Sequence, residues 1–150
     1  MSRLPYPYKH PHPRRYIFTS EGKARIEKVV DFQSTGIRNV MNLSFGDLLE
    51  DGSLNDRVNS NNGDIIKVLT TVVDILKSFT SRYPDVEVFF TGSTNERTRL
   101  YARILKTYYA SFSTEFSIFA ITGTEIDNDP VPFDPSADLE YLGFLIKRIN

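Results

Sequence analysis

Cysteine is absent from this chain of 150 residues, and histidine occurs only twice. A chain without cysteine cannot form disulfides, thiolate zinc sites or iron–sulfur clusters, and it has no cysteine nucleophile. The two histidines, His10 and His12, both lie in a proline-rich N-terminal stretch. A Ser-His-Asp triad or a three-histidine zinc site needs histidine in the folded core. We therefore expect no metal site and no cofactor, and we expect His10 and His12 to be solvated.

Long hydrophobic runs are also missing. The longest apolar runs, residues 88–90 and 118–121, have the length of strands and fall far short of the ~18–20 residues that span a bilayer. The N-terminus lacks the apolar segment of a secretory signal. Glycine-rich loops of the Walker and dinucleotide-binding types are absent as well. These absences predict a cytoplasmic protein without a membrane partner.

The charge is nearly balanced, with 18 Lys and Arg against 19 Asp and Glu, so a general polyanion binder is not expected. Hydrophobic residues make up 40% and charged residues 25% of the chain, which is typical of a packed globular protein. Four of the eight prolines fall within residues 1–15 and favour an extended, polyproline-like arm rather than a strand or helix. Residues 1–12 are expected to contribute little to folding. We expect residues 16–150 to form a single α+β domain.

Hydrophobic periodicity gives the expected elements. Strands are expected at 16–20, at 24–32, where apolar and polar residues alternate, and near 40–45, followed by a polar stretch over 48–62 with turn signals. A helix begins at residue 65 and is ended by Pro84, with an apolar stripe formed by Ile65, Ile66, Leu69, Val72, Val73, Leu76 and Phe79.

A strand over 85–90, a second helix to about Phe112, a strand over 116–122 and a loop over 127–135 follow. Gly143 favours a closing strand over a helix at 141–149. The order β-β-β-α-β-α-β-β predicts a two-layer α+β domain, with two main helices on one face of a largely antiparallel sheet.

The stretch 88–101 could carry chemistry. Gly92 permits a sharp turn after a strand, Ser93 or Thr94 can cap the helix that follows, and Glu96 lies at capping-box spacing from Ser93. The start of a helix is a natural anion site. Arg97 falls on the apolar face of this helix, so it needs a partner. That partner is either a phosphate or carboxylate of a ligand, or an internal group. The internal candidates are exposed carbonyl groups and the carboxylates of Asp47, Asp64 and Glu87.

A second polar stretch, residues 59–64, precedes the first long helix. It contains three asparagines and an aspartate, which is more than a cap requires. One interpretation is an Asx-turn with an N-cap. The other is that this helix start lies beside the loop over 91–97 and completes one polar pocket.

These two stretches resemble a family of small uncharacterised bacterial proteins. The resemblance rests on residues 61–64, 67–69, 91–94 and 97–101, and it extends to 16–32 and 144–148. It implies a self-contained bacterial domain of unknown function and transfers no catalytic residue. Residues 1–15 are the part least like that family.

The function therefore stays open between three classes. The first is a module that binds a phosphate-bearing ligand, such as a nucleotide or a nucleic-acid end. The second is an enzyme acting on such a ligand, with Asp64 or Glu96 as base and Arg97 as electrostatic stabiliser. The third is a protein–protein interaction module that docks through its arm or an edge strand. The candidate ligand-binding residues are Asn61, Asn62, Asp64, Thr91, Ser93, Arg97 and Arg99.

Overall fold

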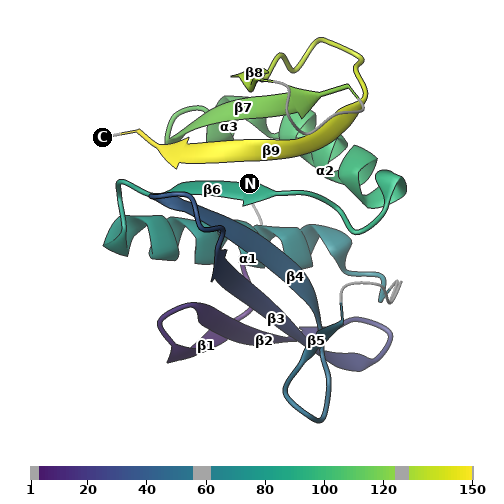
Figure 1. Cartoon of the computed structure of the whole chain (residues 1–150). Helices are drawn as coiled ribbons and strands as arrows, with labels where there is room; N and C mark the ends of the chain where they lie inside the picture. Colours follow the sequence, from purple (N-terminus) through teal and green to yellow (C-terminus); the bar gives the residue numbers. More distant parts are fainter. Residues whose placement is uncertain (1–3, 56–61, 124–128, 150) are drawn as a thin grey trace. The chain divides into compact units, whose positions relative to one another are not determined.

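The structure is a computed structural model that describes residues 4–55, 62–123 and 129–149. It falls into two compact units that alternate along the sequence, and each is described by itself. Unit 1 comprises Met1–Gln33 and Leu43–Tyr83, and unit 2 comprises Ser34–Asn42 and Pro84–Asn150. Figure 1 labels the helices and strands of both.

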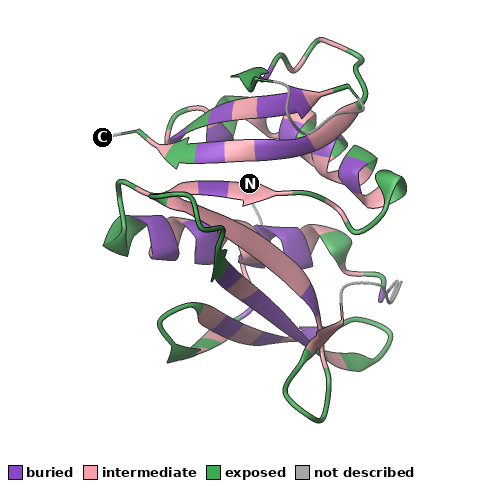
Figure 2. Cartoon of the chain, viewed as in Figure 1, coloured by how far each residue is buried: buried purple, intermediate pink, exposed green. Residues whose placement is uncertain are grey.

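Unit 1 is built on an antiparallel meander. Its strands are β1 (Tyr8–His12), β2 (Arg15–Glu21), β3 (Arg25–Ser34), most of β4 (Val40–Leu48) and the short β5 (Leu54–Asn55). Tyr16 and Phe18 of β2 are buried, and they pair directly with Val30 and Lys28 of β3. Directly paired residues share a face of the sheet. Strands β2 and β3 therefore share a buried face, and Figure 2 shows the alternation of burial along β2, whereas β3 is also buried at Val29 on its other face.

Helix α1 (Ile65–Arg82) packs on this buried face. The ring of Phe79 stacks on that of Phe32 with 3.8 Å between centroids and 1° between planes. The predicted boundaries of the helix are confirmed, and its end lies two residues before Pro84.

The predicted apolar stripe of α1 is only partly confirmed. Leu69, Leu76 and Phe79 are buried, whereas Ile65 is 47% exposed. The fully buried face also includes threonines, because Thr71 and Thr80 each donate their hydroxyl at 2.8 Å to the backbone carbonyl four residues earlier. A threonine bonded in this way packs like an apolar side chain, which a stripe drawn from apolar residue types misses.

Unit 2 contains the C-terminal strands and two helices. Strand β6 (Glu87–Phe90) runs parallel to residues 40–42 of β4 and antiparallel to β9 (Tyr141–Arg148). Strand β7 (Phe116–Thr122) pairs antiparallel with β9 and, on its other side, with β8 (Val131–Pro132). The helices are α2 (Asn95–Thr107) and α3 (Tyr109–Phe112).

The predicted fold class is confirmed. The strand order is β1-β2-β3-β4-β6-β9-β7-β8 with β5 beside β4, and every assigned pairing except β4–β6 is antiparallel. The chain is therefore an α+β protein with a mostly antiparallel open sheet. The predicted second helix is interrupted at Tyr108, and the short strands β5 and β8 were not predicted.

The expectation that prolines keep the N-terminal stretch out of strands is wrong for residues 8–12. These residues form β1, which pairs with β2 at the edge of the sheet. An edge strand tolerates Pro11, since a missing N–H on the solvent side breaks no ladder bond. Tyr6, just before β1, is only 6% exposed, so this stretch is docked on unit 1.

Candidate functional site

The polar stretch before α1 is engaged in internal hydrogen bonds. Asn62 is 5% exposed, its amide donates to the Ala24 carbonyl at 2.7 Å and to the Ser20 hydroxyl at 2.9 Å, and its side-chain oxygen accepts from the Ala24 N–H at 2.8 Å. The backbone of Asn62 lies close to Gly22 in the β2–β3 turn, since a Cβ on Gly22 would be only 1.8 Å from the Asn62 carbonyl oxygen. Asn62 thus fastens the β2–β3 turn to the start of α1. Asn61 lies outside the described residues.

Asp64 occupies the N-cap position of α1, but its side chain makes no capping hydrogen bond. Its Oδ2 instead accepts hydrogen bonds from the Tyr6 hydroxyl at 2.6 Å and the Ser20 hydroxyl at 2.5 Å. Burial by itself would raise the pKa of Asp64, but the bonds from Ser20 and Tyr6 outweigh it and hold this pKa below its ordinary value. The Asp64 side chain therefore does not cap the helix, as an N-cap residue would. Its carboxylate instead binds the N-terminal stretch through the Tyr6 hydroxyl.

The contact of Tyr6 with Asp64 was not predicted from the sequence. The Tyr6 ring stacks on Phe18 at 6.0 Å between centroids, and the Lys67 ammonium lies 4.4 Å from its centre. Burial raises the pKa of the Tyr6 hydroxyl, and the bond to Asp64 raises it further, so Tyr6 stays a donor at neutral pH. The sequence signal was a tyrosine among prolines, which does not reveal a partner 58 residues away.

A buried ion pair in unit 1 was also not predicted as a pair. The Lys28 ammonium contacts the Asp47 carboxylate at 2.5 Å, and both side chains are largely buried, with 8% and 14% exposure. The signal in the sequence was Lys28 in an alternating run of apolar residues on the core side of β3. A lysine on a buried face requires a nearby carboxylate.

The loop between β6 and α2 forms the second predicted motif, in unit 2. The Gly92 N–H donates to the Thr98 hydroxyl at 3.0 Å, and a Cβ on Gly92 would lie 2.5 Å from the Thr98 nitrogen. This close approach explains the glycine. Thr94 caps α2, because its hydroxyl accepts from the Arg97 N–H at 3.2 Å. Of the two predicted caps, Thr94 is the one used, so Glu96 is not at capping-box spacing from the cap.

The two arginines of the motif differ in their surroundings. Arg97 is half-buried, and its Nη1 donates to the Ser93 hydroxyl at 3.2 Å. Arg99 is exposed and lies 3.8 Å from the Glu140 carboxylate. Thr91 donates its hydroxyl to the Leu142 carbonyl of β9. The loop thus places the Arg97 guanidinium and the hydroxyls of Ser93 and Thr94 at one helix start, with Arg99 one position beyond the first turn.

The structure brings together the members of each motif separately. Asn62 and Asp64 belong to unit 1, whereas Thr91, Ser93, Arg97 and Arg99 belong to unit 2. That the two helix starts form one polar pocket stays a prediction.

Histidine and carboxylate groups show no metal-binding arrangement in residues 4–55, 62–123 and 129–149, where no group of three or more His, Cys, Asp or Glu could hold an ion. His10, expected to be solvated, stacks on the Tyr16 ring at 4.0 Å between centroids and is half-buried. His12 accepts at Nδ1 from the Arg14 N–H at 3.3 Å.

Comparison with protein families gives a match over nearly the whole chain. A protein-family model described as a family of unknown function (DUF6934) matches residues 2–149, which includes the proline-rich N-terminal stretch. Neither the curated proteins nor the solved structures gave a match. Among the described helices, none has the length and apolar character needed to cross a membrane.

Proposed function

The chain belongs to DUF6934, a family of unknown function, and we propose that it binds a phosphate-bearing ligand, a nucleotide or a nucleic-acid end, at the start of α2. The proposed contacts are Ser93, Arg97, Arg99 and the first N–H groups of α2. A bacterial, cytoplasmic setting is part of this proposal and rests on the sequence alone.

The observation that carries the proposal is the position of Arg97. Its guanidinium is held on the Ser93 hydroxyl at the N-terminal end of α2, where the helix dipole is positive. A cation in the first turn opposes that dipole, at a cost of roughly 0.3–1 kcal/mol. An anion bound at this end would meet the cation, the dipole and the N–H groups of residues 95 and 96, which have no intrahelical acceptor. Glu96 in the first turn and Glu140, 3.8 Å from Arg99, offset part of the positive charge of the two arginines.

The proposal is tested by titrating the full chain with inorganic phosphate, adenosine monophosphate and a short 5′-phosphorylated oligonucleotide, using calorimetry and the thermal midpoint. Arg97→Ala should weaken binding by roughly 10–100-fold, the worth of a hydrogen bond from a charged group. The matched control is Arg103→Ala, which removes an exposed guanidinium two turns from the loop on the same helix. It should bind within about twofold of the wild type, because it lies away from the helix start.

Two results would contradict the proposal. One is that no probe binds or raises the thermal midpoint at millimolar concentration. The other is that Arg97→Ala and Arg103→Ala weaken binding equally, which would indicate general electrostatic attraction. If Arg97 serves an internal carboxylate instead, Arg97→Ala should lower the free energy of unfolding by about 3–5 kcal/mol.

A further inference from the structure

The stretch comprising residues 4–12, called the N-terminal segment from here on, docks on one face of α1 through three hydrogen bonds. The Tyr6 N–H donates to the Thr71 hydroxyl at 2.8 Å, and the Tyr6 hydroxyl donates to Asp64. The Tyr8 hydroxyl donates to the Asp74 carboxylate at 2.9 Å. The three helix positions are spaced by seven and three residues, so they lie on one side of the helix. Unit 1 therefore has a receptor surface for this segment, made by α1 and the edge of β2.

The connection between the N-terminal segment and β2 is a tight turn that suits a hairpin poorly. His12 pairs with Arg15, which leaves only Pro13 and Arg14 in the loop. Two-residue hairpin loops that match the twist of their strands require a positive φ. The proline ring fixes a negative φ at Pro13, and among the described residues only Asn39 and four glycines have a positive φ. The β1–β2 register is also irregular between Lys9 and His12. The turn is thus mismatched to the hairpin that it closes.

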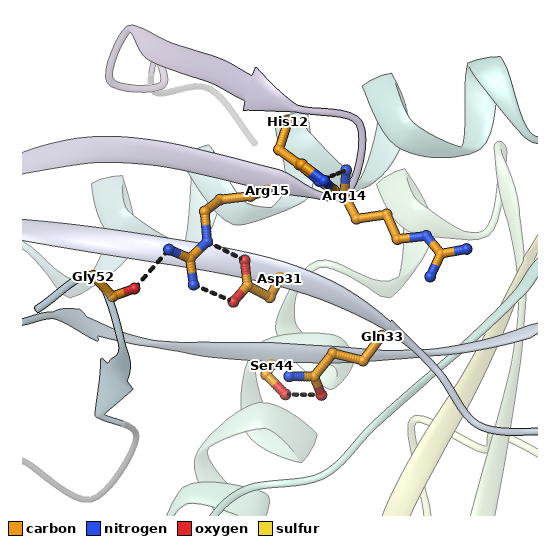
Figure 3. A network of polar contacts seen from close by, with 7 residues as sticks. All are labelled: His12, Arg14, Arg15, Asp31, Gln33, Ser44 and Gly52. Atoms are coloured by element: carbon orange, nitrogen blue, oxygen red, sulfur yellow. Dashed lines mark hydrogen bonds and ion pairs between the residues drawn. The ribbon is translucent and has the colours of Figure 1, made fainter.

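The β2 side of this turn is held firmly. Arg15 makes a two-pronged contact with Asp31, with both N–O distances at 2.8 Å, and its Nη1 donates to the Gly52 carbonyl at 2.6 Å. Figure 3 shows this network and the Arg14 guanidinium, which points away from it. The Phe32 N–H also donates to the Arg14 carbonyl at 2.9 Å. Because β2 is fixed up to Arg14, rotation at His12 and Pro13 would move the N-terminal segment as one piece.

We infer that the N-terminal segment exchanges between two copies of the chain, so that the segment of one copy occupies the receptor surface of the other. Every docking bond would be remade with an identical partner, and only the turn would change. Opening the turn removes the mismatch at Pro13, and His12, already extended as the last residue of β1, can keep the backbone that the residue before a proline prefers. Exchange of an identical element between protomers is a low-cost route to a dimer, and a short hinge loop that fits its hairpin poorly favours it. The partner of this surface is therefore a second copy of this chain.

The experiment uses the absence of cysteine from the sequence. Lys9 of β1 and Ile17 of β2 are directly paired, which places their Cα atoms within disulfide range. Lys9→Cys and Ile17→Cys are made as separate single variants, mixed at high concentration, unfolded, refolded together and then oxidised. A disulfide between the two variants forms through β1–β2 pairing only if the segment has crossed. We expect that mixed disulfide, in a species with the mass of a dimer.

Two controls make the result specific. Lys9→Cys mixed with Glu27→Cys, an exposed site on β3 that does not pair with β1, measures random crosslinking. Replacing the loop by Pro13→Asn with Arg14→Gly supplies the turn that two-residue hairpins prefer, and it should lower the yield of the mixed disulfide by ~10-fold or more. Circular dichroism checks that each variant is folded. A yield equal to the Glu27→Cys control, or a yield unchanged by the new loop, would overturn the inference.

Discussion

Replacement of Tyr6 by alanine should destabilise the protein strongly, although the residue lies only six positions from the N-terminus. The side chain is 6% exposed, stacks on Phe18 and donates its hydroxyl to Asp64. Truncating a buried aromatic residue to alanine costs about 3–5 kcal/mol through lost transfer energy and the cavity left behind. For a chain of this size each kcal/mol lowers the thermal midpoint by roughly 2–4 °C, so a fall of roughly 6–20 °C is expected.

The assay is urea unfolding followed by circular dichroism, with the thermal midpoint as a second measure. Leu4→Ala is the matched control, because Leu4 lies in the same segment and is 82% exposed. It should change the free energy of unfolding by less than about 0.5 kcal/mol. Tyr6→Phe keeps the ring and removes the hydroxyl, which donates to Asp64 and accepts from the Glu21 N–H at 3.1 Å, so it measures the two bonds together at about 1.5–3 kcal/mol. A Tyr6→Ala variant as stable as Leu4→Ala would refute the docking of the N-terminal segment.

Three more predictions concern helix α1, the loop before α2 and the carboxylate of Asp64. Leu69→Ala should cost about 2–5 kcal/mol in urea unfolding, because Leu69 is buried on α1, whereas Ile65→Ala should cost less than about 0.5 kcal/mol. Gly92→Ala should destabilise by about 1–3 kcal/mol, since its Cβ would lie 2.5 Å from the Thr98 nitrogen, and a neutral effect would disprove the close approach. The lowered pKa of Asp64 means that its carboxylate stabilises the fold above the unfolded-state pKa of about 3.9 and that this stability is lost as the pH falls through the folded-state pKa. Asp64→Asn should therefore lose less stability than the wild type between about pH 5 and pH 2 in the same assay.

Elements with a strong local pattern were predictable from the sequence. The strand over 116–122 and the helix ended by Pro84 are found as expected, because alternation and helical periodicity reflect which face is buried. Strands β5 and β8 have two residues each, so they carry no period. Strand β1 was not predicted because it contains a proline and is flanked by others. A proline is compatible with an edge strand, but the sequence does not show which strand lies at the edge.

In the candidate site too, contacts between residues close in sequence were predictable, whereas contacts between distant residues were not. The cap at Thr94 and the contact between Arg97 and Ser93 follow from spacing within one helix start, and they were within reach of the sequence. The bonds of Asn62 to Ser20 and Ala24 join residues about 40 positions apart. A sequence identifies Asn62 as an unusual polar residue before a helix but does not say which turn it will meet.

The alternation of the two units along the chain bears on how the protein can be cut and how it is made. Residues 34–42 leave unit 1 for unit 2 before unit 1 is complete, and strand β4 is divided between the two at residues 42 and 43. A break after residue 83 keeps all of unit 1 in one fragment but separates residues 34–42 from the rest of unit 2, so no single break leaves both units intact. During synthesis, unit 1 cannot close until α1 has left the ribosome, and unit 2 must wait for β9 at the C-terminus. Contacts between residues so far apart in sequence make folding slow. Fragments that end inside either unit are therefore expected to expose apolar strand faces and aggregate.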